Sequence, residues 1–298
     1  RIKPISQEYA KTALVQLASA NFCYGKRPAN EVVVQSMKPS AAYHYCLESF
    51  CEVRSTAQAE IPFTGMSVDT SANGQPPTPW EVQVFAKEKF KDEKKVCEVP
   101  HTASVQNCRK CKGNGTETCT ACQGKGQNPC SQCQGPQCPA CQGHGAKVCQ
   151  TCAGKGVKTC DTCKGHKMVK SYIQLTVEWF NHVSHFVHQT QSSLPEQLVQ
   201  SAPGQIVFKE ENPWVYPIQQ CPEPTINKAS LDLLTKHKDQ FKNERLLLQR
   251  QTVKIVPITE VQCQWEGKEF TEYVYGTDNQ AYCPDYPQKW CCGHCNIL

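Results

Sequence analysis

The sequence lacks a membrane-spanning apolar run: none of its apolar stretches approaches the roughly 20 residues that a transmembrane helix needs. Its first residues do not show a basic segment followed by an apolar one, which is the pattern of a secretory signal. Catalytic triads, glycine-rich phosphate loops and paired-carboxylate motifs are missing too, so we predict no catalytic residues. A net charge of +5 over 298 residues does not by itself indicate a nucleic-acid partner.

Aromatic residues are missing from one long segment. Residues 108–170 contain no Phe, Trp or Tyr and only a few aliphatic residues, which are Val148, Val157, Met168 and Val169. This segment cannot bury enough apolar surface to offset the ordering of its backbone, which costs ~1–2 kcal/mol per residue. A bound metal must therefore replace an apolar core if the segment folds.

Cysteine is abundant in the same segment. Of 22 cysteines, twelve lie in residues 108–163, and all twelve form CxxC pairs. The first cysteines of successive pairs are separated by 11, 11, 8, 11 and 11 residues, which indicates a repeated local structure. Four pairs extend to CxxCxGxG, whereas the third (CSQCQGPQ) and sixth (CDTCKGHK) lack the second glycine. The pairs are Cys108/Cys111, Cys119/Cys122, Cys130/Cys133, Cys138/Cys141, Cys149/Cys152 and Cys160/Cys163.

The CxxC spacing predicts zinc. Two cysteines on a tight turn direct both sulfurs to one side of the backbone, and two such turns complete the closed tetrahedral Cys₄ geometry of structural zinc. A zinc ion contributes about 10–16 kcal/mol of apparent folding free energy at neutral pH, so ordering this segment requires several ions. We predict three Zn²⁺ ions on the twelve cysteines, and regard a disulfide ladder or a metal-free thiol segment as the alternative.

The step pattern reads the same from both ends, which favours a nested arrangement. In it, the first pair meets the sixth, the second meets the fifth and the third meets the fourth. Sequential pairing, in which the first pair meets the second, is the alternative. Both schemes join the third and fourth pairs.

CxxCxGxG repeats resemble the cysteine-rich domain of DnaJ-type co-chaperones, whose four repeats bind two zinc ions in a nested ribbon. Here there are six repeats, and the His-Pro-Asp tripeptide of a J domain is absent from the sequence. The resemblance covers about 56 residues and implies polypeptide binding without stimulation of an ATPase. Central repeats between β-rich arms are also similar to the Ssu-two homologue family, which implies a zinc protein of the cytoplasm and possible nuclear location.

The flanking sequences predict an α+β fold, with β-rich arms, a few helices and a protruding, metal-stabilised cysteine-rich β-ribbon. We divide the chain into an N-terminal arm (1–100), the zinc module (101–170), a C-terminal arm (171–283) packed on the N-terminal arm, and a flexible tail (284–298). The strands that enter and leave the zinc module should pair, because a nested ribbon brings its ends together.

Periodicity predicts the elements of the arms. A helix over 5–20 should be capped by Ser6 and bury a stripe that includes Tyr9. A helix is also predicted over 228–250. Strands are predicted over 43–54, from Trp80 to Val84, and over 173–179, and a hairpin over 253–275 should turn at Glu266-Gly267.

The scattered cysteines and a histidine series offer weaker signals. We interpret seven cysteines as buried small apolar residues. We interpret the three histidines as non-ligands, because residues three apart in a strand point to opposite faces of the sheet. These residues are Cys23, Cys46, Cys51, Cys97, Cys221, Cys263 and Cys283, and His182, His185 and His188.

The final four residues, Cys295-Asn296-Ile297-Leu298, match the C-a-a-X prenylation pattern, with Leu favouring geranylgeranyl. One lipid gives only reversible membrane binding, so Cys291 and Cys292 are predicted as palmitoylation sites. An unmodified tail is the alternative. Prenylation would place the protein in the reducing cytosol, where CxxC pairs stay reduced and bind metal.

Three functions remain to be weighed. Residues 108–170 carry ten Lys/Arg against two Asp/Glu, an excess of eight that three Zn(Cys)₄ sites would reduce by six. With no aromatic residues for base stacking, nucleic-acid binding is disfavoured. Thiol–disulfide exchange normally uses one activated pair rather than six equivalent ones. We therefore expect a non-catalytic, chaperone-like protein that binds client or partner polypeptides, with peripheral membrane association through its lipid anchor.

Overall fold

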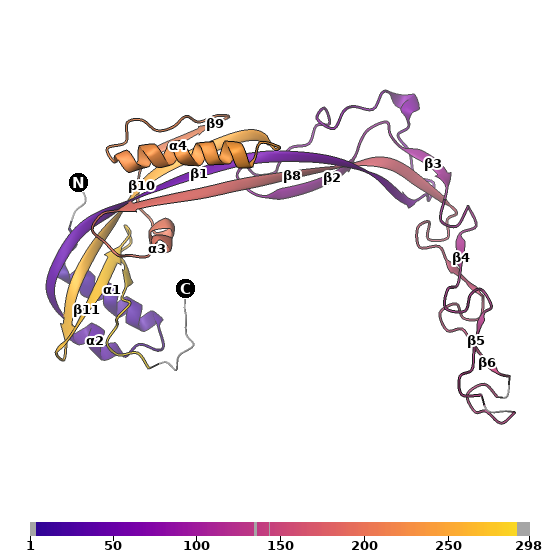
Figure 1. Cartoon of the computed structure of the whole chain (residues 1–298), viewed down its shortest axis with the longest axis horizontal. Coiled ribbons are helices and arrows are strands. Elements are labelled where there is room, and N and C mark those ends of the chain that lie inside the picture. Colours follow the sequence, from indigo (N-terminus) through magenta and orange to yellow (C-terminus); the bar gives the residue numbers. More distant parts are fainter. Residues whose placement is uncertain (1–3, 134–135, 143, 291–298) are drawn as a thin grey trace. The chain divides into compact units, whose positions relative to one another are not determined.

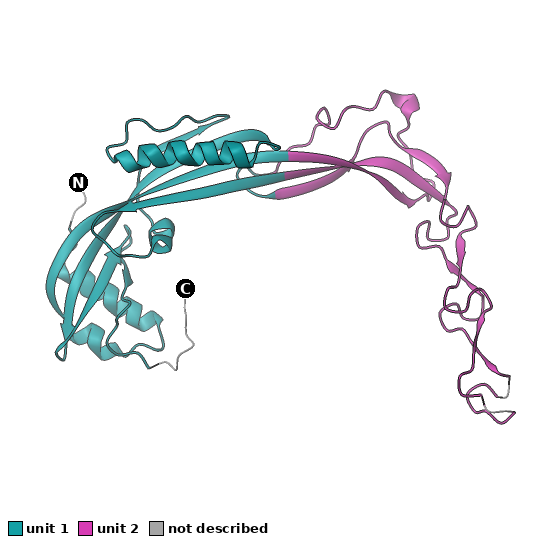
Figure 2. Cartoon of the chain, in the orientation of Figure 1, with its two compact units in different colours: residues 1–52, 88–92, 179–298 teal, residues 53–87, 93–178 magenta. Residues whose placement is uncertain are grey.

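A computed structural model describes residues 4–133, 136–142 and 144–290. Most of its regular structure is β-strand, with four α-helices among these residues. The chain forms two compact units, shown separately coloured in Figure 2. Unit 1 comprises residues 1–52, 88–92 and 179–298, and unit 2 comprises residues 53–87 and 93–178. Each unit therefore collects segments that are distant in the sequence.

The elements are labelled in Figure 1. No helix in the described part of the chain is long and apolar enough to cross a membrane. In chain order the elements are α1 (Gln7–Ala20), α2 (Lys26–Glu31), β1 (Val33–Pro62), η1 (Ser71–Asn73), β2 (Glu93–Glu98), β3 (Ser104–Asn107), β4 (Thr116–Thr118), β5 (Gln127–Pro129), β6 (Ala146–Val148), β7 (Val157–Thr159), β8 (Met168–Gln189), α3 (Glu196–Ser201), β9 (Gln205–Asn212), α4 (Pro224–Gln240), β10 (Arg245–Trp265), β11 (Lys268–Tyr275) and β12 (Gln280–Tyr282).

The main sheet has the strand order β12-β11-β10-β1-β8-β2, with β3 paired to β8 and β9 paired to β10. Strands β1 and β10 run antiparallel from Val33↔Gln264 to Glu52↔Arg245. Strands β10 and β11 form the predicted hairpin, and its turn residues Glu266 and Gly267 both have positive φ. Two-residue hairpin loops of type I′ require this conformation.

Apolar clusters hold unit 1 together. Helix α1 begins as predicted, because Ser6 accepts a hydrogen bond from the Tyr9 backbone N–H. Its buried residue Leu14 packs in one cluster with Val261 of β10 and Phe270 of β11. Burying each such side chain contributes about 1.5–3 kcal/mol. Tyr9 itself is 61% exposed, so its predicted place in the buried stripe is wrong.

Helix α4 packs on the sheet through a second cluster. Its Ile226 contacts the cluster that contains Tyr45 of β1 and Val253 of β10, and all three side chains are fully buried. The predicted helix over 228–250 is wrong beyond Gln240, since β10 begins at Arg245. Pairing with β1 overrides the local helical spacing there, because Leu246 and Leu248 lie opposite Cys51 and Phe50.

Unit 2 contains the cysteine repeats. Strand β3 enters them and β8 leaves them, and the two strands pair from Ser104↔Ser171 to Asn107↔Met168. The predicted pairing of entering and leaving strands is therefore confirmed. Between them, β4 pairs with β7 and β5 pairs with β6, each as a separate two-stranded sheet.

The predicted strand from Trp80 to Val84 is wrong. This segment is a loop whose carbonyl groups turn towards Arg54 of β1. The Arg54 guanidinium donates to the carbonyl oxygens of Pro79 at 2.5 Å and Val82 at 2.8 Å. A cation satisfies these carbonyls in place of a neighbouring strand, which the alternation of apolar residues did not reveal.

Candidate metal centre

Each cysteine pair lies on a turn that its own backbone stabilises. In the first pair, the Gly113 N–H donates to the Cys108 carbonyl at 3.2 Å, and the Gly115 N–H donates to the Cys111 Sγ at 3.2 Å. The second hydrogen bond stabilises a thiolate, because it places a donor on the sulfur that would ligate a metal. The same N–H to Sγ bond recurs from Gly126 to Cys122 and from Gly156 to Cys152.

The turn needs positive φ at successive residues. In the first repeat, Lys112 has φ of 54° and Gly113 of 81°. Glycine adopts this region at no steric cost, which explains the glycine directly after each CxxC-x unit. In the sixth repeat Lys167 takes the position of the missing second glycine and still has φ of 69°.

The first and sixth pairs meet. Strand β4 pairs with β7 from Thr116↔Thr159 to Thr118↔Val157, which aligns the flanking knuckles. The Sγ atoms of Cys108 and Cys160 are then 3.7 Å apart. Those of Cys111 and Cys163 are 3.6 Å apart. All four thiols are buried and lie within 4.8 Å of one another.

The second and fifth pairs meet in the same way. The Cys119 and Cys149 sulfurs are 3.8 Å apart, and the Cys122 and Cys152 sulfurs are 3.7 Å apart. Tetrahedral coordination with Zn–S bonds near 2.3 Å places the sulfurs about 3.8 Å apart. The observed spacing therefore fits a tetrahedral Cys₄ metal site.

The third and fourth pairs form a looser group. Cys130, Cys138 and Cys141 have sulfurs within 4.8 Å of one another. The fourth cysteine, Cys133, has its sulfur 3.5 Å from that of Cys141 and is the one repeat cysteine that is only half-buried. The structure thus brings the pairs together in the nested order, and the sequential alternative is not found.

The pKa values of neighbouring thiols within a group are shifted in opposite directions. In the second group, burial raises the pKa of Cys122 despite a hydrogen bond from Gly126. Burial acts on Cys149 as well, but backbone N–H groups of Cys152 and Thr151 lower its pKa below the usual value. One thiol of the group ionises readily, and its negative charge then opposes ionisation of the next thiol. A bound metal cation would offset the repulsion between the two thiolates.

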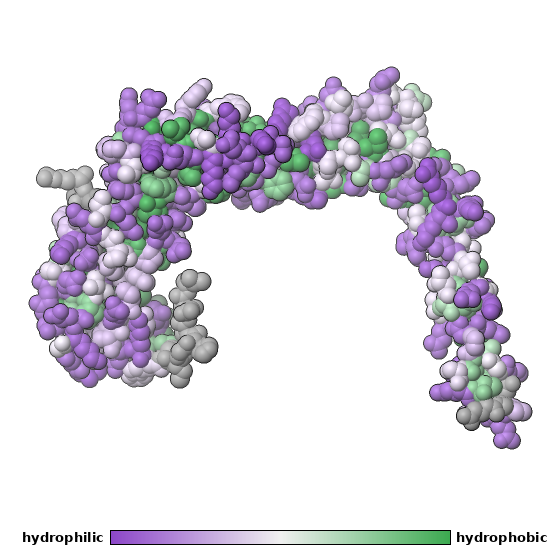
Figure 3. Space-filling view, viewed as in Figure 1, coloured by the Kyte–Doolittle hydropathy of each residue, from purple (hydrophilic) through white to green (hydrophobic). Residues whose placement is uncertain are grey.

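All twelve repeat cysteines are free thiols. Figure 3 shows a mainly hydrophilic surface over the repeats, at the lower right of the view. Cysteine sulfurs form the buried clusters here, joined by Val169 in the first group. The three groups could hold metal ions, and their all-sulfur donor sets are compatible with zinc.

One further group joins residues that sequence reasoning set aside. The thiol of Cys51, the imidazole of His182 and the carboxylate of Glu244 lie within 4.8 Å of one another. Cys51 is buried, in agreement with its interpretation as a buried small apolar residue, and the interpretation of His182 as a non-ligand stays a prediction. No local spacing could have signalled this group, because its members lie on β1, on β8 and in the turn before β10.

The other two histidines of the series have different surroundings. His185 shares a hydrogen bond of 3.0 Å with His44, and His188 lies 3.6 Å from the Glu223 carboxylate. Among the remaining scattered cysteines, Cys23, Cys263 and Cys283 are buried, whereas Cys46, Cys97 and Cys221 are half-buried. The lipidation sites Cys291, Cys292 and Cys295 lie outside the described residues.

Three curated proteins resemble this chain along most of its length, whereas no family model matches it. The protein SSUH2 homolog of Homo sapiens is 39% identical over 307 residues, covering 100% of this chain and 82% of that protein. The protein SSUH2 homolog of Danio rerio is 40% identical, covering 98% of this chain and 82% of that protein. That of Mus musculus is 36% identical over 84% of this chain and 76% of that protein. Identity at this level over nearly the whole sequence places the chain in the SSUH2 homolog family.

Proposed function

We propose that this protein is a zinc-dependent, non-catalytic scaffold that binds other polypeptides. The observation that carries the proposal is the set of three nested cysteine groups, whose paired sulfurs are 3.5–4.0 Å apart. On this proposal each group holds one Zn²⁺, and the ions stabilise residues 108–163 as a ribbon in place of an apolar core. Closed Cys₄ sites leave no position for a substrate, which supports a structural role.

A binding surface for polypeptides is available in unit 1. Strand β9 pairs with β10 on one side, from Gln249↔Asn212 to Ile255↔Gln205. Within the described residues no strand pairs with its other edge. Its residues Ile206, Val207 and Phe208 are 59%, 47% and 37% exposed, which is unusual for three successive apolar residues.

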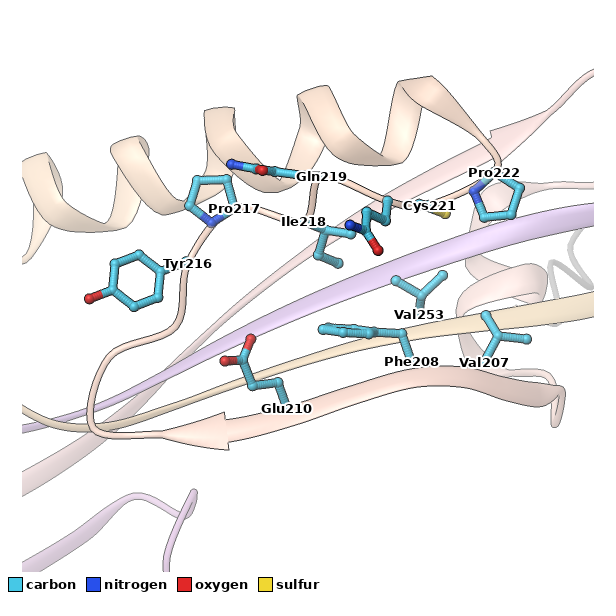
Figure 4. A pocket seen from close by; sticks show the side chains of 11 residues that line it. Val207, Phe208, Glu210, Tyr216, Pro217, Ile218, Gln219, Cys221, Pro222 and Val253 are labelled. Carbon is cyan, nitrogen blue, oxygen red and sulfur yellow. The ribbon is translucent and has the colours of Figure 1, made fainter.

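Next to this strand is a pocket of about 740 Å³. Figure 4 shows Phe208 and Val253 on its sheet side and the segment from Tyr216 to Pro222 opposite them. The pocket is lined by Val207, Phe208, Glu210, Tyr216, Pro217, Ile218, Gln219, Gln220, Cys221, Pro222 and Val253.

An extended polypeptide fits both features. The free edge of β9 offers backbone N–H and C=O groups to an added strand, and the pocket offers apolar contact for a side chain of that strand. Backbone pairing is independent of sequence, so such a surface suits clients of varied sequence. We therefore place client binding at β9, in the class of extended segments with apolar side chains.

Native mass spectrometry tests the metal part of the proposal. We expect at least three Zn²⁺ ions in the intact protein, of which the repeats bind three, and one fewer after Cys119→Ser/Cys122→Ser. A mass with no zinc and twelve oxidised thiols would refute it, as would two ions whose number is unaffected by that double variant.

Suppression of aggregation of a reduced, unfolding client protein tests the binding part. The metal-loaded protein should suppress light scattering at stoichiometric amounts, and Val207→Ser should weaken the effect several-fold. Val183→Ser is the matched control, because Val183 is 45% exposed on β8 and does not line the pocket. No suppression at stoichiometric excess would contradict client binding, and equal loss in both variants would contradict its placement at β9.

We also propose cytosolic location with a lipid tether at Cys295, assisted by Cys291 or Cys292. This part depends on the sequence pattern alone. Replacement by Cys295→Ser should move the protein from the membrane fraction to the soluble fraction of cells, and an unchanged distribution would refute the tether.

A further inference from the structure

Cys51, His182 and Glu244 come from three separate parts of unit 1. Cys51 lies in β1, His182 in β8, and Glu244 in the turn between α4 and β10. Their sulfur, nitrogen and oxygen atoms lie within 4.8 Å of one another. No residue of this group belongs to the cysteine repeats, so the group is independent of the three Cys₄ clusters.

The imidazole of His182 is held in place from two sides. Its ring stacks in parallel on Phe241, with 3.4 Å between centroids and 5° between planes. Its Nε2 atom is 2.7 Å from the Oε2 of Glu244. Phe241 and Glu244 belong to the same short turn after α4, so one turn positions both the ring and the carboxylate.

Cys51 lies opposite an irregularity of β10. The register between β1 and β10 shifts between Phe50 and Cys51. The extra residue is Leu247 of β10, and bulges of this kind are common beside functional sites. Cys51 is 2% exposed, whereas the side chains of His182 and Glu244 are 21% and 20% exposed. The group is therefore closed on the sulfur side and open to solvent on the other.

The donor set matches that of an open metal site. Thiolate sulfur, imidazole nitrogen and carboxylate oxygen are the three ligand types of protein-bound zinc, and three protein ligands leave a fourth position for water. A thiolate and a carboxylate together supply two negative charges, which balance a divalent cation. Metal–ligand bonds of about 2.0–2.3 Å place neighbouring ligand atoms about 3.3–3.7 Å apart. On metal binding, the distance between the His182 Nε2 and the Glu244 Oε2 would therefore increase by roughly 0.6 Å.

We propose that Cys51, His182 and Glu244 bind one divalent transition-metal ion of the zinc type, with a solvent molecule as its fourth ligand. This fourth site differs from the repeat clusters in having an exchangeable position. It therefore takes a small anionic or neutral ligand that the closed Cys₄ sites have no room for.

Metal content of the full-length protein tests the site. The protein is purified with zinc, dialysed against buffer with low zinc, and analysed for zinc per chain alongside Cys51→Ala, Glu244→Ala and the control Cys46→Ala. Cys46 is a half-buried thiol of the same strand and outside the group. We expect one equivalent less in Cys51→Ala and Glu244→Ala than in the wild type, and no change in Cys46→Ala.

The test compares the zinc content of the wild type and the variants, so it does not depend on how many ions the repeats hold. Failure of the three-zinc proposal is therefore distinguishable from failure of this site. Cobalt provides a second measurement. Subtracting the spectrum of Co²⁺-loaded Cys51→Ala from that of the wild type should leave thiolate-to-cobalt absorption from a single sulfur. Should Cys51→Ala fail to fold, Glu244→Ala in the partly exposed turn carries the test. Equal metal content in the wild type and the folded variants would overturn the proposal.

Discussion

At the scale of single residues, the glycines of the repeats are required for different structural reasons. Gly126 and Gly154 belong to the second and fifth repeats, which face each other. A Cβ atom on Gly126 would lie 2.3 Å from the Gly154 carbonyl oxygen, and one on Gly156 would lie 2.3 Å from that of Gly124. Such distances are far below van der Waals contact, so backbone approach as well as positive φ selects glycine here. Gly145 has φ of 70°, but a Cβ atom there would meet no described atom within 4 Å beyond its chain neighbours.

Gly126→Ala should therefore damage the second metal group more than Gly145→Ala damages its own. Both substitutions incur the cost of positive φ, about 1 kcal/mol, but only the first also forces two backbones apart. Competition with a zinc-binding dye should show faster loss of one ion from Gly126→Ala. Equal metal retention in the two variants would show that backbone approach has no part in selecting this glycine.

A second residue-scale feature is the buried carboxyl of Glu272 in β11. Its side chain is 1% exposed, its Oε1 has no hydrogen-bond partner among the described residues, and the Cys263 sulfur is 4.0 Å from its Oε2. Burial raises the pKa of Glu272 from 4.5 to about 8. The folded protein thus holds this carboxyl protonated near neutral pH.

This shift predicts the pH dependence of stability. Below about pH 4.5 the carboxyl is protonated in both states, and between there and pH 8 only the unfolded state ionises, so stability falls as pH rises. The full loss is roughly 4 to 5 kcal/mol at 1.36 kcal/mol per pKa unit. Glu272→Gln should flatten this dependence in urea unfolding between pH 5 and 9. The exposed Glu269→Gln on the same strand serves as control, and a wild-type slope in Glu272→Gln would contradict the burial argument.

At the scale of elements, pairing partners decided where strands and helices begin and end. Helix α4 ends at Gln240 because the following residues pair with β1, although Leu248 lies at helical spacing from Leu234 and Phe241. The segment after Trp80 has the alternation of a strand, yet it forms a loop around Arg54. Both differences arise from contacts with residues that are distant in the sequence.

Arg54→Ala should release this loop. The variant loses charged hydrogen bonds to Pro79 and Val82 and the contact of the guanidinium with the Trp80 ring at 5.1 Å. We expect a destabilisation of about 2 kcal/mol and faster hydrogen exchange in residues 78–86. Arg54→Lys keeps the charge without the planar fork, so it should show an intermediate effect. Exchange rates equal to those of the wild type would show that the loop is held by other contacts.

At the scale of the whole molecule, the two units depend on different sources of stability. Among the described residues, unit 1 contains apolar clusters built on α1, α3, α4 and the sheet. The repeats in unit 2 have buried clusters made almost entirely of cysteine. Apolar burial supplies the folding free energy of the first kind of structure, whereas metal binding would supply it to the second.

Removal of metal should therefore unfold one part of the chain. After treatment with a strong chelator under reducing conditions, we expect amide protection to be lost across residues 108–163 and retained in β1 and β10. Hydrogen exchange with mass spectrometry measures both regions in one experiment, and readdition of zinc should restore the lost protection. Unchanged protection of the repeats, or its simultaneous loss in β1 and β10, would contradict this division.

The tertiary structure decided the nested order of the cysteine pairs over the sequential order, whereas the spacing only favoured it. The sequence alone determined the turn of each pair, because the CxxC spacing and the glycines act within one repeat. It also determined α1 and the β10–β11 hairpin, whose cap and turn residues act within a few positions. The tertiary structure alone decided the end of α4, the loop around Arg54 and the meeting of Cys51, His182 and Glu244. Those features depend on contacts between residues far apart in the chain, and the packing of the sheet brings them together.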